Sequence, residues 1–159
     1  MPARLLFAIG DHLTKALISG SFDQYRALMD LPLRIVPQGA TGYVLHTDAE
    51  LQADFQLYHA VIKAQGVTDI YRQFRRQETL SDGAISITFT THVLVKAHRI
   101  FDPFETTMRL IERPGGWRIS HIESVEDHIK WTLGHKSRPL TAQVLDLSLL
   151  QGSDDDAKT

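Results

Sequence analysis

The sequence contains no cysteine, which excludes disulfides, thiolate nucleophiles and zinc–thiolate sites. It also lacks a long apolar run, because the stretch Leu5–Ile9 is far too short for a signal-peptide core or a membrane span. Lys and Arg are not clustered, and 17 basic against 19 acidic residues give a net charge of −2. We therefore expect a cytoplasmic protein with neither a nucleic-acid nor a membrane partner.

Motifs for nucleotides and for serine nucleophiles are absent as well. The sequence has no Gly-x-Gly-x-x-Gly, no phosphate loop and no Gly-x-Ser-x-Gly. Histidine recurs every seven residues at His121, His128 and His135. The first of these lies on a predicted strand and the others in a different element, without an accompanying carboxylate cluster. We expect no metal and no cofactor.

The length and composition indicate one globular domain. The chain has 159 residues, of which 43% are hydrophobic and 23% charged, and a chain of this size buries about 70% of its unfolded surface. We expect a single domain over residues 1–136 and an extension of unclear structure over 137–150. Residues 151–159 read as a solvated acidic tail, because they include Asp154, Asp155 and Asp156 and nothing to bury.

Three helices are predicted in the first half of the chain. The first has an apolar arc at helical spacing and ends at Gly20. Ser21 and Gln24 form a capping box for a short second helix, which Pro32 ends, and Thr47-Asp48-Ala49-Glu50 form a capping box for the third. The predicted helices cover residues 4–19, 21–29 and 47–66.

From Asp69 the hydrophobic period changes from that of a helix to that of a strand. Turn residues at 81–83, 102–103 and 114–116 separate the alternating segments. Strands this long must bend and twist strongly. The predicted strands cover residues 69–80, 84–100, 104–113 and 116–125, with two brief ones at 33–36 and 43–46.

Helices followed by an antiparallel meander predict an α+β layout with the helices on one face of a bent sheet. The closing hairpin reads Arg113-Pro114-Gly115-Gly116-Trp117-Arg118-Ile119-Ser120-His121. This hairpin resembles the last one of the nuclear transport factor 2-like superfamily, SnoaL-like branch, and the order of elements is similar over residues 4–125. The resemblance implies a cone-shaped curved antiparallel sheet covered on one face by three N-terminal helices, and a homodimer.

The predicted cone encloses an apolar pocket, and Asp54 is its first candidate catalytic residue. Its position interrupts the apolar arc of the helix at 47–66, and an unpaired buried carboxylate is costly. Two interpretations stay open: a general base with a raised pKa, or a structural carboxylate that either forms an ion pair, for example with Arg72 or Arg76, or reaches solvent at the edge of the arc.

His121 is the second candidate catalytic residue. Strict alternation puts it on the inward face of the last strand together with Trp117 and Glu123. A histidine oriented by a carboxylate can act as an acid or a base near neutral pH. The alternative is a histidine bonded to backbone and a solvated Glu123.

Further side chains on inward faces are candidate ligand-binding residues. Tyr58 can donate a hydrogen bond to a bound carbonyl, and two threonines lie on apolar strand faces. For each, a place in the core is the alternative interpretation. The candidate ligand-binding residues are Tyr58, Thr91, Thr106, Trp117, Glu123, Phe55 and Phe89.

The fold suggests three functions. The leading hypothesis is a protein that binds a small apolar ligand in the cone pocket. The alternatives are a cofactor-free isomerase, dehydratase or polyketide-cyclase-like lyase, and a non-catalytic partner subunit; the resemblance covers all of these classes.

Overall fold

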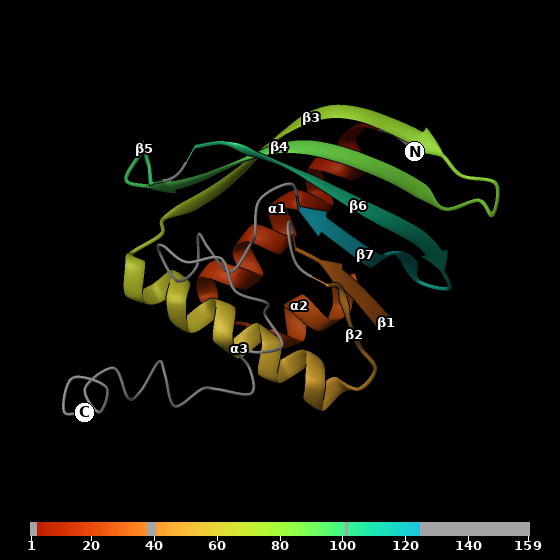
Figure 1. Ribbon diagram of the computed structural model, residues 1–159, viewed down its shortest axis with the longest axis horizontal. Helices are drawn as coiled ribbons and strands as arrows, with labels where there is room; N and C mark the ends of the chain where they lie inside the picture. Colours follow the sequence, from red (N-terminus) through yellow and green to blue (C-terminus); the bar gives the residue numbers. More distant parts are fainter. Residues whose placement is uncertain (1–2, 38–40, 101, 125–159) are drawn as a thin grey trace.

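Three helices lie on one side of a curved sheet in the computed structural model, which describes residues 3–37, 41–100 and 102–124 (Figure 1). This arrangement confirms the predicted α+β class. The helices are α1 (Ala3–Ser19), α2 (Phe22–Leu28) and α3 (Asp48–Gln65). The strands are β1 (Met29–Val36), β2 (Tyr43–Leu45), β3 (Asp69–Thr79), β4 (Ile85–Val95), β5 (His98–Arg99), β6 (Phe104–Arg113) and β7 (Gly116–Ser124). The predicted boundaries at 136 and 150, and the tail, fall outside the described residues.

Side-chain caps set the starts of α2 and α3 where the sequence predicts them, but only Thr47 and Glu50 form a full capping box. The Oγ of Ser21 accepts a hydrogen bond from the backbone N–H of Gln24 at 3.3 Å. At the start of α3, Thr47 Oγ1 accepts from the N–H of Glu50 at 3.1 Å, and the Glu50 carboxylate accepts from the N–H of Thr47 at 3.3 Å. These bonds satisfy N–H groups that have no partner within the helix.

The second helix ends earlier than Pro32. It stops at Leu28, and β1 begins at Met29, which pairs with Ile119 of β7. Pro32 lies inside β1, in the interval where the β1–β7 register shifts. A proline has no N–H to donate, so it fits a strand where the ladder is irregular.

The sheet has the strand order β2-β1-β7-β6-β4-β3, and neighbouring strands are antiparallel with one exception. Strands β1 and β7 are parallel, so the sheet is mixed rather than wholly antiparallel. No tight turn joins these two strands, and alternation within a strand carries no information on the direction of a distant partner. The sequence therefore could not predict that β1 and β7 run parallel.

The predicted strand at 84–100 begins as expected but is too long. Strand β4 ends at Val95, and the chain turns at Lys96 and Ala97, whose φ angles are 49° and 70°. The next residues fold back as β5, with Val95 opposite His98. Two consecutive positive φ angles are typical of a tight hairpin turn that normally takes Gly or Asn. Lys-Ala carries no such signal.

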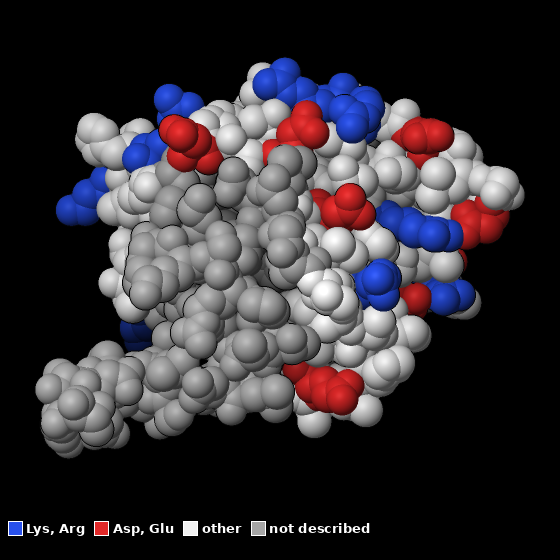
Figure 2. Space-filling model, viewed as in Figure 1, with Lys and Arg blue, Asp and Glu red and all other residues white. Residues whose placement is uncertain are grey.

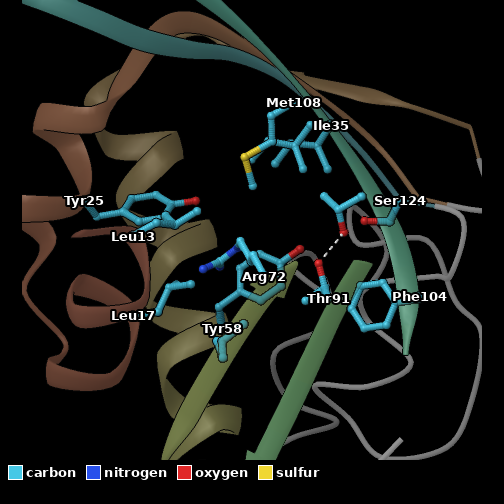
Figure 3. A pocket seen from close by; sticks show the side chains of 13 residues that line it. Leu13, Leu17, Tyr25, Ile35, Tyr58, Arg72, Thr91, Phe104, Met108 and Ser124 are labelled. Carbon is cyan, nitrogen blue, oxygen red and sulfur yellow. Dashed lines mark hydrogen bonds between the residues drawn. The ribbon is translucent and has the colours of Figure 1, made fainter. Parts of the chain in front are cut away.

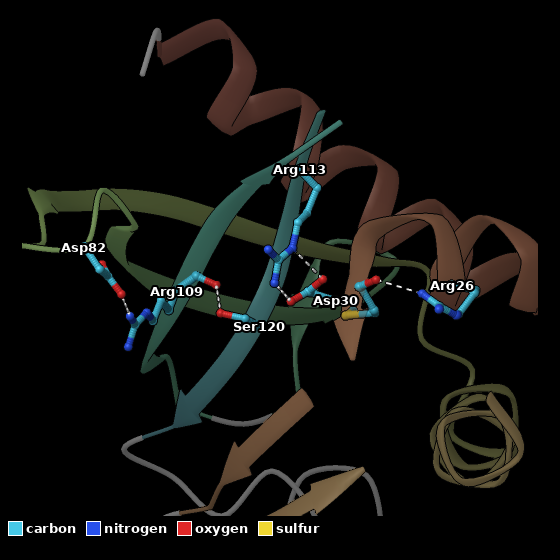
Figure 4. Close-up of polar contacts among 7 residues, drawn as sticks. Arg26, Asp30, Asp82, Arg109, Arg113 and Ser120 are labelled. Atoms are coloured by element: carbon cyan, nitrogen blue, oxygen red, sulfur yellow. Dashed lines mark hydrogen bonds and ion pairs between the residues drawn. The ribbon is translucent and has the colours of Figure 1, made fainter. Parts of the chain in front are cut away.

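A β-bulge in β7 changes which side chains face the helices. Arg109 of β6 pairs with His121, but the next residue, Leu110, pairs with Ile119, so Ser120 is the extra residue. The Ser120 hydroxyl donates to the carbonyl of Arg109 at 3.3 Å (Figure 4). An extra residue in one strand reverses the alternation beyond it.

Charged side chains support the sheet from outside. Arg113 at the end of β6 donates two hydrogen bonds to the carboxylate of Asp30 in β1, at 3.1 and 2.9 Å, and Arg109 pairs with Asp82 (Figure 4). Figure 2 shows acidic side chains next to basic ones across the face drawn. Among the described residues, no helix has the length and apolarity needed to cross a membrane.

Gly20, at the end of α1, lies directly against His59 of α3. Its φ is 77°, and a Cβ at this position would lie 2.5 Å from His59 Nε2. The imidazole cannot easily move, because His59 Nδ1 lies 2.8 Å from the carbonyl of Leu17 and the ring stacks on Phe55. Gly20 therefore allows α1 and α3 to approach.

We expect Gly20→Ala to destabilise the protein more than Gly66→Ala. Both glycines follow a helix with φ near 70°, but nothing lies within 4 Å of a Cβ at Gly66. The Gly66 variant should lose about 1 kcal/mol for the left-handed backbone, and the Gly20 variant roughly 1–3 kcal/mol more for overpacking. Urea unfolding measures both, and equal losses would contradict the contact with His59.

Candidate functional site

A partly open cavity lies between the helices and the concave face of the sheet (Figure 3). About 90 Å³ of it is accessible to the centre of a water molecule. All three helices and five of the strands contribute to its wall, which is mainly apolar. The apolar lining residues are Leu13, Leu17, Ile35, Ile70, Phe104, Met108 and Ile122.

A few polar groups interrupt this apolar wall. Thr91 of β4 donates a hydrogen bond to Thr106 of β6 at 3.1 Å, and the Tyr25 hydroxyl points into the cavity (Figure 3). Isolated donors and acceptors in an apolar pocket orient a bound molecule. The polar lining residues are Tyr25, Tyr58, Arg72, Thr91, Thr106 and Ser124.

Helix α1 holds the guanidinium of Arg72 at the cavity. Arg72 Nη1 donates to the carbonyl of Gly10 at 3.0 Å and to Thr14 Oγ1 at 2.6 Å. Thr14 in turn donates to the carbonyl of Ile70 at 2.9 Å. Burial lowers the pKa of Arg72 to about 10, so the side chain is still a cation at neutral pH. No carboxylate of the described residues forms an ion pair with it.

Asp54 is buried, with 1% of its surface exposed, but the predicted ion pair with Arg72 or Arg76 does not form. Arg72 reaches α1 instead, and Arg76 is exposed beyond the register shift in β3. The Tyr43 hydroxyl donates to Asp54 Oδ1 at 3.3 Å, whereas Oδ2 has no partner among the described residues. Burial raises the pKa of Asp54 to about 7, opposed by the hydrogen bond from Tyr43.

Asp54 does not line the cavity, but its charge acts on a residue that does. Burial raises the pKa of Tyr25 above its usual value; the negative charge of Asp54 raises it further, and the positive charge of Arg72 opposes this. Tyr25 is therefore a neutral phenol at physiological pH. It presents a hydrogen-bond donor to the cavity.

The bulge at Ser120 overturns the predicted orientation of His121 and Glu123. Beyond it, Ile122 and Ser124 line the cavity, while His121 Nε2 lies 3.4 Å from Glu123 Oε1 outside the lining. The two side chains meet as a pair, yet neither contributes to the cavity wall.

The other predicted ligand-binding residues have different places. Tyr58, Thr91 and Thr106 line the cavity. Trp117 is half-buried against the core without lining the cavity. Phe55 lies in the core, with its ring centre 4.7 Å from that of Tyr25 and 5.7 Å from that of Phe22. Phe89 lines a groove between α1 and β3.

Sequence analysis missed Tyr25, Arg72 and Ser124. Arg72 did carry a signal, because it alternates with Ile70 and Phe74 along one side of β3. An arginine between two apolar residues at strand spacing is an interrupted apolar face, like that of Asp54. The bulge places Ser124 on the side of β7 that strict alternation does not predict. Helix α2 is too short for its hydrophobic pattern to indicate where Tyr25 points.

A cavity under a curved sheet with three covering helices defines an α+β cone fold with an internal pocket. Among solved structures the chain is similar to ActVI-ORFA from Streptomyces coelicolor, with 16% identity, TM-score 0.59 and coverage of 77% of this chain and 95% of that one. It is also similar to an NTF-2 like protein of unknown function from Shewanella oneidensis, with 15% identity, TM-score 0.56 and coverage of 78% and 98%.

A third similar structure covers 96% of both chains. It is a domain of unknown function with a cystatin-like fold from Nostoc punctiforme, with 14% identity and TM-score 0.60. No family model and no curated protein matches the chain. At these identities the likeness concerns the fold alone. The chain has the nuclear transport factor 2-like fold, as the resemblance of its closing hairpin predicted.

Within the described residues, no group of three or more His, Asp or Glu side chains is placed to hold a metal ion. The site itself offers polar groups of several kinds. These are the cation of Arg72, the phenol of Tyr25, the threonine pair and the buried carboxyl of Asp54 behind them in the protein interior.

We expect Asp54→Asn to change how stability depends on pH. The folded pKa of about 7 lies above the unfolded value near 3.8, so between these values the folded protein binds more protons. The free energy of unfolding then falls as pH rises, by roughly 2–3 kcal/mol from pH 5 to pH 8. Urea unfolding should show this fall in wild type and not in Asp54→Asn.

The matched control is Asp48→Asn, a change at an exposed carboxylate of the same helix. Its stability should vary with pH as that of wild type does. An unchanged slope in Asp54→Asn would show that burial does not raise the pKa of Asp54.

Proposed function

We propose that the protein binds a small, mainly apolar organic molecule in the cavity. The observation that carries this proposal is a largely apolar cavity into which the polar groups of Tyr25, Arg72 and the Thr91–Thr106 pair converge. The cavity is partly open among the described residues, so a small molecule can enter it and contact these groups.

The size of the cavity limits the ligand. Sites for drug-sized molecules have volumes of roughly 300–1,000 Å³, whereas about 90 Å³ is accessible here. A benzene molecule occupies an apolar cavity of about 150 Å³. The proposed ligand is therefore a compact molecule, and a single six-membered ring is an upper limit for the part of it that the cavity encloses.

Binding of neutral probes should be measurable by NMR. In titrations with benzene and isobutyramide, we expect chemical-shift changes at lining residues such as Leu13, Ile35 and Met108, and Ile122→Phe should weaken binding at least tenfold by filling the cavity. His121→Phe, one residue away and outside the lining, is the matched control and should bind as wild type does. Shifts outside the lining, or equal binding by both variants, would contradict the proposal.

One observation favours a second candidate, a cofactor-free lyase or isomerase. Asp54 titrates near neutrality, has an unpartnered oxygen, and acts on the phenol of Tyr25. Tyr25 would donate a hydrogen bond to a carbonyl oxygen while Asp54 takes the neighbouring proton. Binding ranks first, because a base must reach the proton and Asp54 does not line the cavity.

Proton exchange tests the second candidate. If Asp54 is the base, the protein should accelerate exchange of the α-protons of cyclopentanone in D₂O, with a midpoint near pH 7. Asp54→Asn should abolish the acceleration and the exposed Asp48→Asn should retain it. A protein that binds the ketone without accelerating exchange would exclude this candidate for that substrate.

The homodimer stays a prediction of the resemblance. The side of β4 that faces away from the helices carries Ser86, Thr90 and His92. An obligate interface is usually more apolar than this.

A further inference from the structure

Some N–H groups of the Arg72 guanidinium have no hydrogen-bond partner among the described residues. Both N–H groups of Nη1 are used, one by Gly10 and one by Thr14. A guanidinium has five N–H groups, and those of Nε and Nη2 make no hydrogen bond with the described residues. These are the donors that form a two-pronged contact with a carboxylate.

The unused N–H groups of Arg72 matter because of where the guanidinium lies. Arg72 lines the cavity and also the groove between α1 and β3, and Figure 3 shows its nitrogen atoms on the side of Tyr25 and Leu13. It is a partly buried cation for which the described residues supply no ion-pair partner. The negative charge of Asp69 favours the cation of Arg72, but Asp69 makes no hydrogen bond to the guanidinium. A bound anion that accepts hydrogen bonds from the guanidinium would further offset the cost of burying the charge.

The remaining groups of the wall fit one end of such an anion. Tyr25 offers a neutral hydroxyl donor near Arg72, and apolar side chains including Leu17, Ile35 and Met108 cover most of the rest of the cavity. The two donors lie on one side of an otherwise apolar space. This asymmetry suits a molecule with a charged end and an apolar end.

We propose that the ligand is a small monocarboxylic acid, whose carboxylate binds Nε and Nη2 of Arg72 and accepts a hydrogen bond from Tyr25, while its short hydrocarbon part fills the apolar side. This inference rests on the proposed function, which requires that a small, mainly apolar molecule binds in the cavity. It adds the chemical class of the ligand. Arg72 and Tyr25 are the residues that select it.

Comparing a carboxylic acid with the amide of the same shape isolates the effect of the ligand's negative charge on binding. Wild type should bind isobutyrate at least ten times more tightly than isobutyramide, and benzoate more tightly than benzamide, in NMR titrations at pH 7. The amides keep the shape and lose the negative charge, so the ratio within a pair reports on the cation. This comparison requires no variant and does not depend on whether an Arg72 substitution folds.

Variants then assign the preference to Arg72. Arg72→Met should remove the acid preference while isobutyramide still binds, and Arg72→Lys, a single point charge, should retain part of it. Arg76→Met, at an exposed arginine of the same strand, is the matched control and should keep the full preference. Tyr25→Phe should weaken isobutyrate binding several-fold.

The outcomes separate the two proposals. Amides bound as tightly as acids would overturn the carboxylate inference and leave the binding function intact. An acid preference that persists in Arg72→Met would place the anion elsewhere and also overturn the inference. If neither acids, amides nor benzene bind, the proposed function fails, and the inference fails with it.

Discussion

The contact between Arg72 and α1 links the architecture of this protein to its cavity. Arg72 reaches from β3 to Gly10 and Thr14, and Thr14 returns a hydrogen bond to the carbonyl of Ile70 on the same strand. This closed set of bonds fixes the helix over the sheet in a region where apolar packing alone permits sliding. It also keeps a cation at the cavity wall, where an apolar residue of similar length would provide packing without charge.

The composition of the cavity depends equally on the bulge in β7. Without the extra residue Ser120, strict alternation would continue inward from Ile119 to His121 and Glu123, giving a wall with a titratable pair. With it, Ile122 and Ser124 take those places. One inserted residue thus replaces a histidine–carboxylate pair by an apolar side chain and a hydroxyl, and this favours binding over acid–base chemistry at that end of the cavity.

Local signals in the sequence predicted most of the fold and part of the site. The caps at Ser21 and Thr47 and the turn residues between strands act within a few positions, so they can be recognised without tertiary structure. The parallel β1–β7 pair and the bulge at Ser120 depend on distant partners. For the same reason Asp54 could be recognised as a buried carboxylate, since it interrupts one helix face, while its actual neighbour Tyr43 could not.

Both ends of the described sheet carry features that hinder its extension. Strand β2, at one end, is only three residues long. Strand β3, at the other, has an irregular register between Phe74 and Arg76, and it exposes Arg75 and Arg76. A second chain that added a strand there would meet a distorted ladder and would have to strip water from guanidinium groups. The described sheet can therefore keep a long outer strand whose edge is unfavourable for pairing with a second chain.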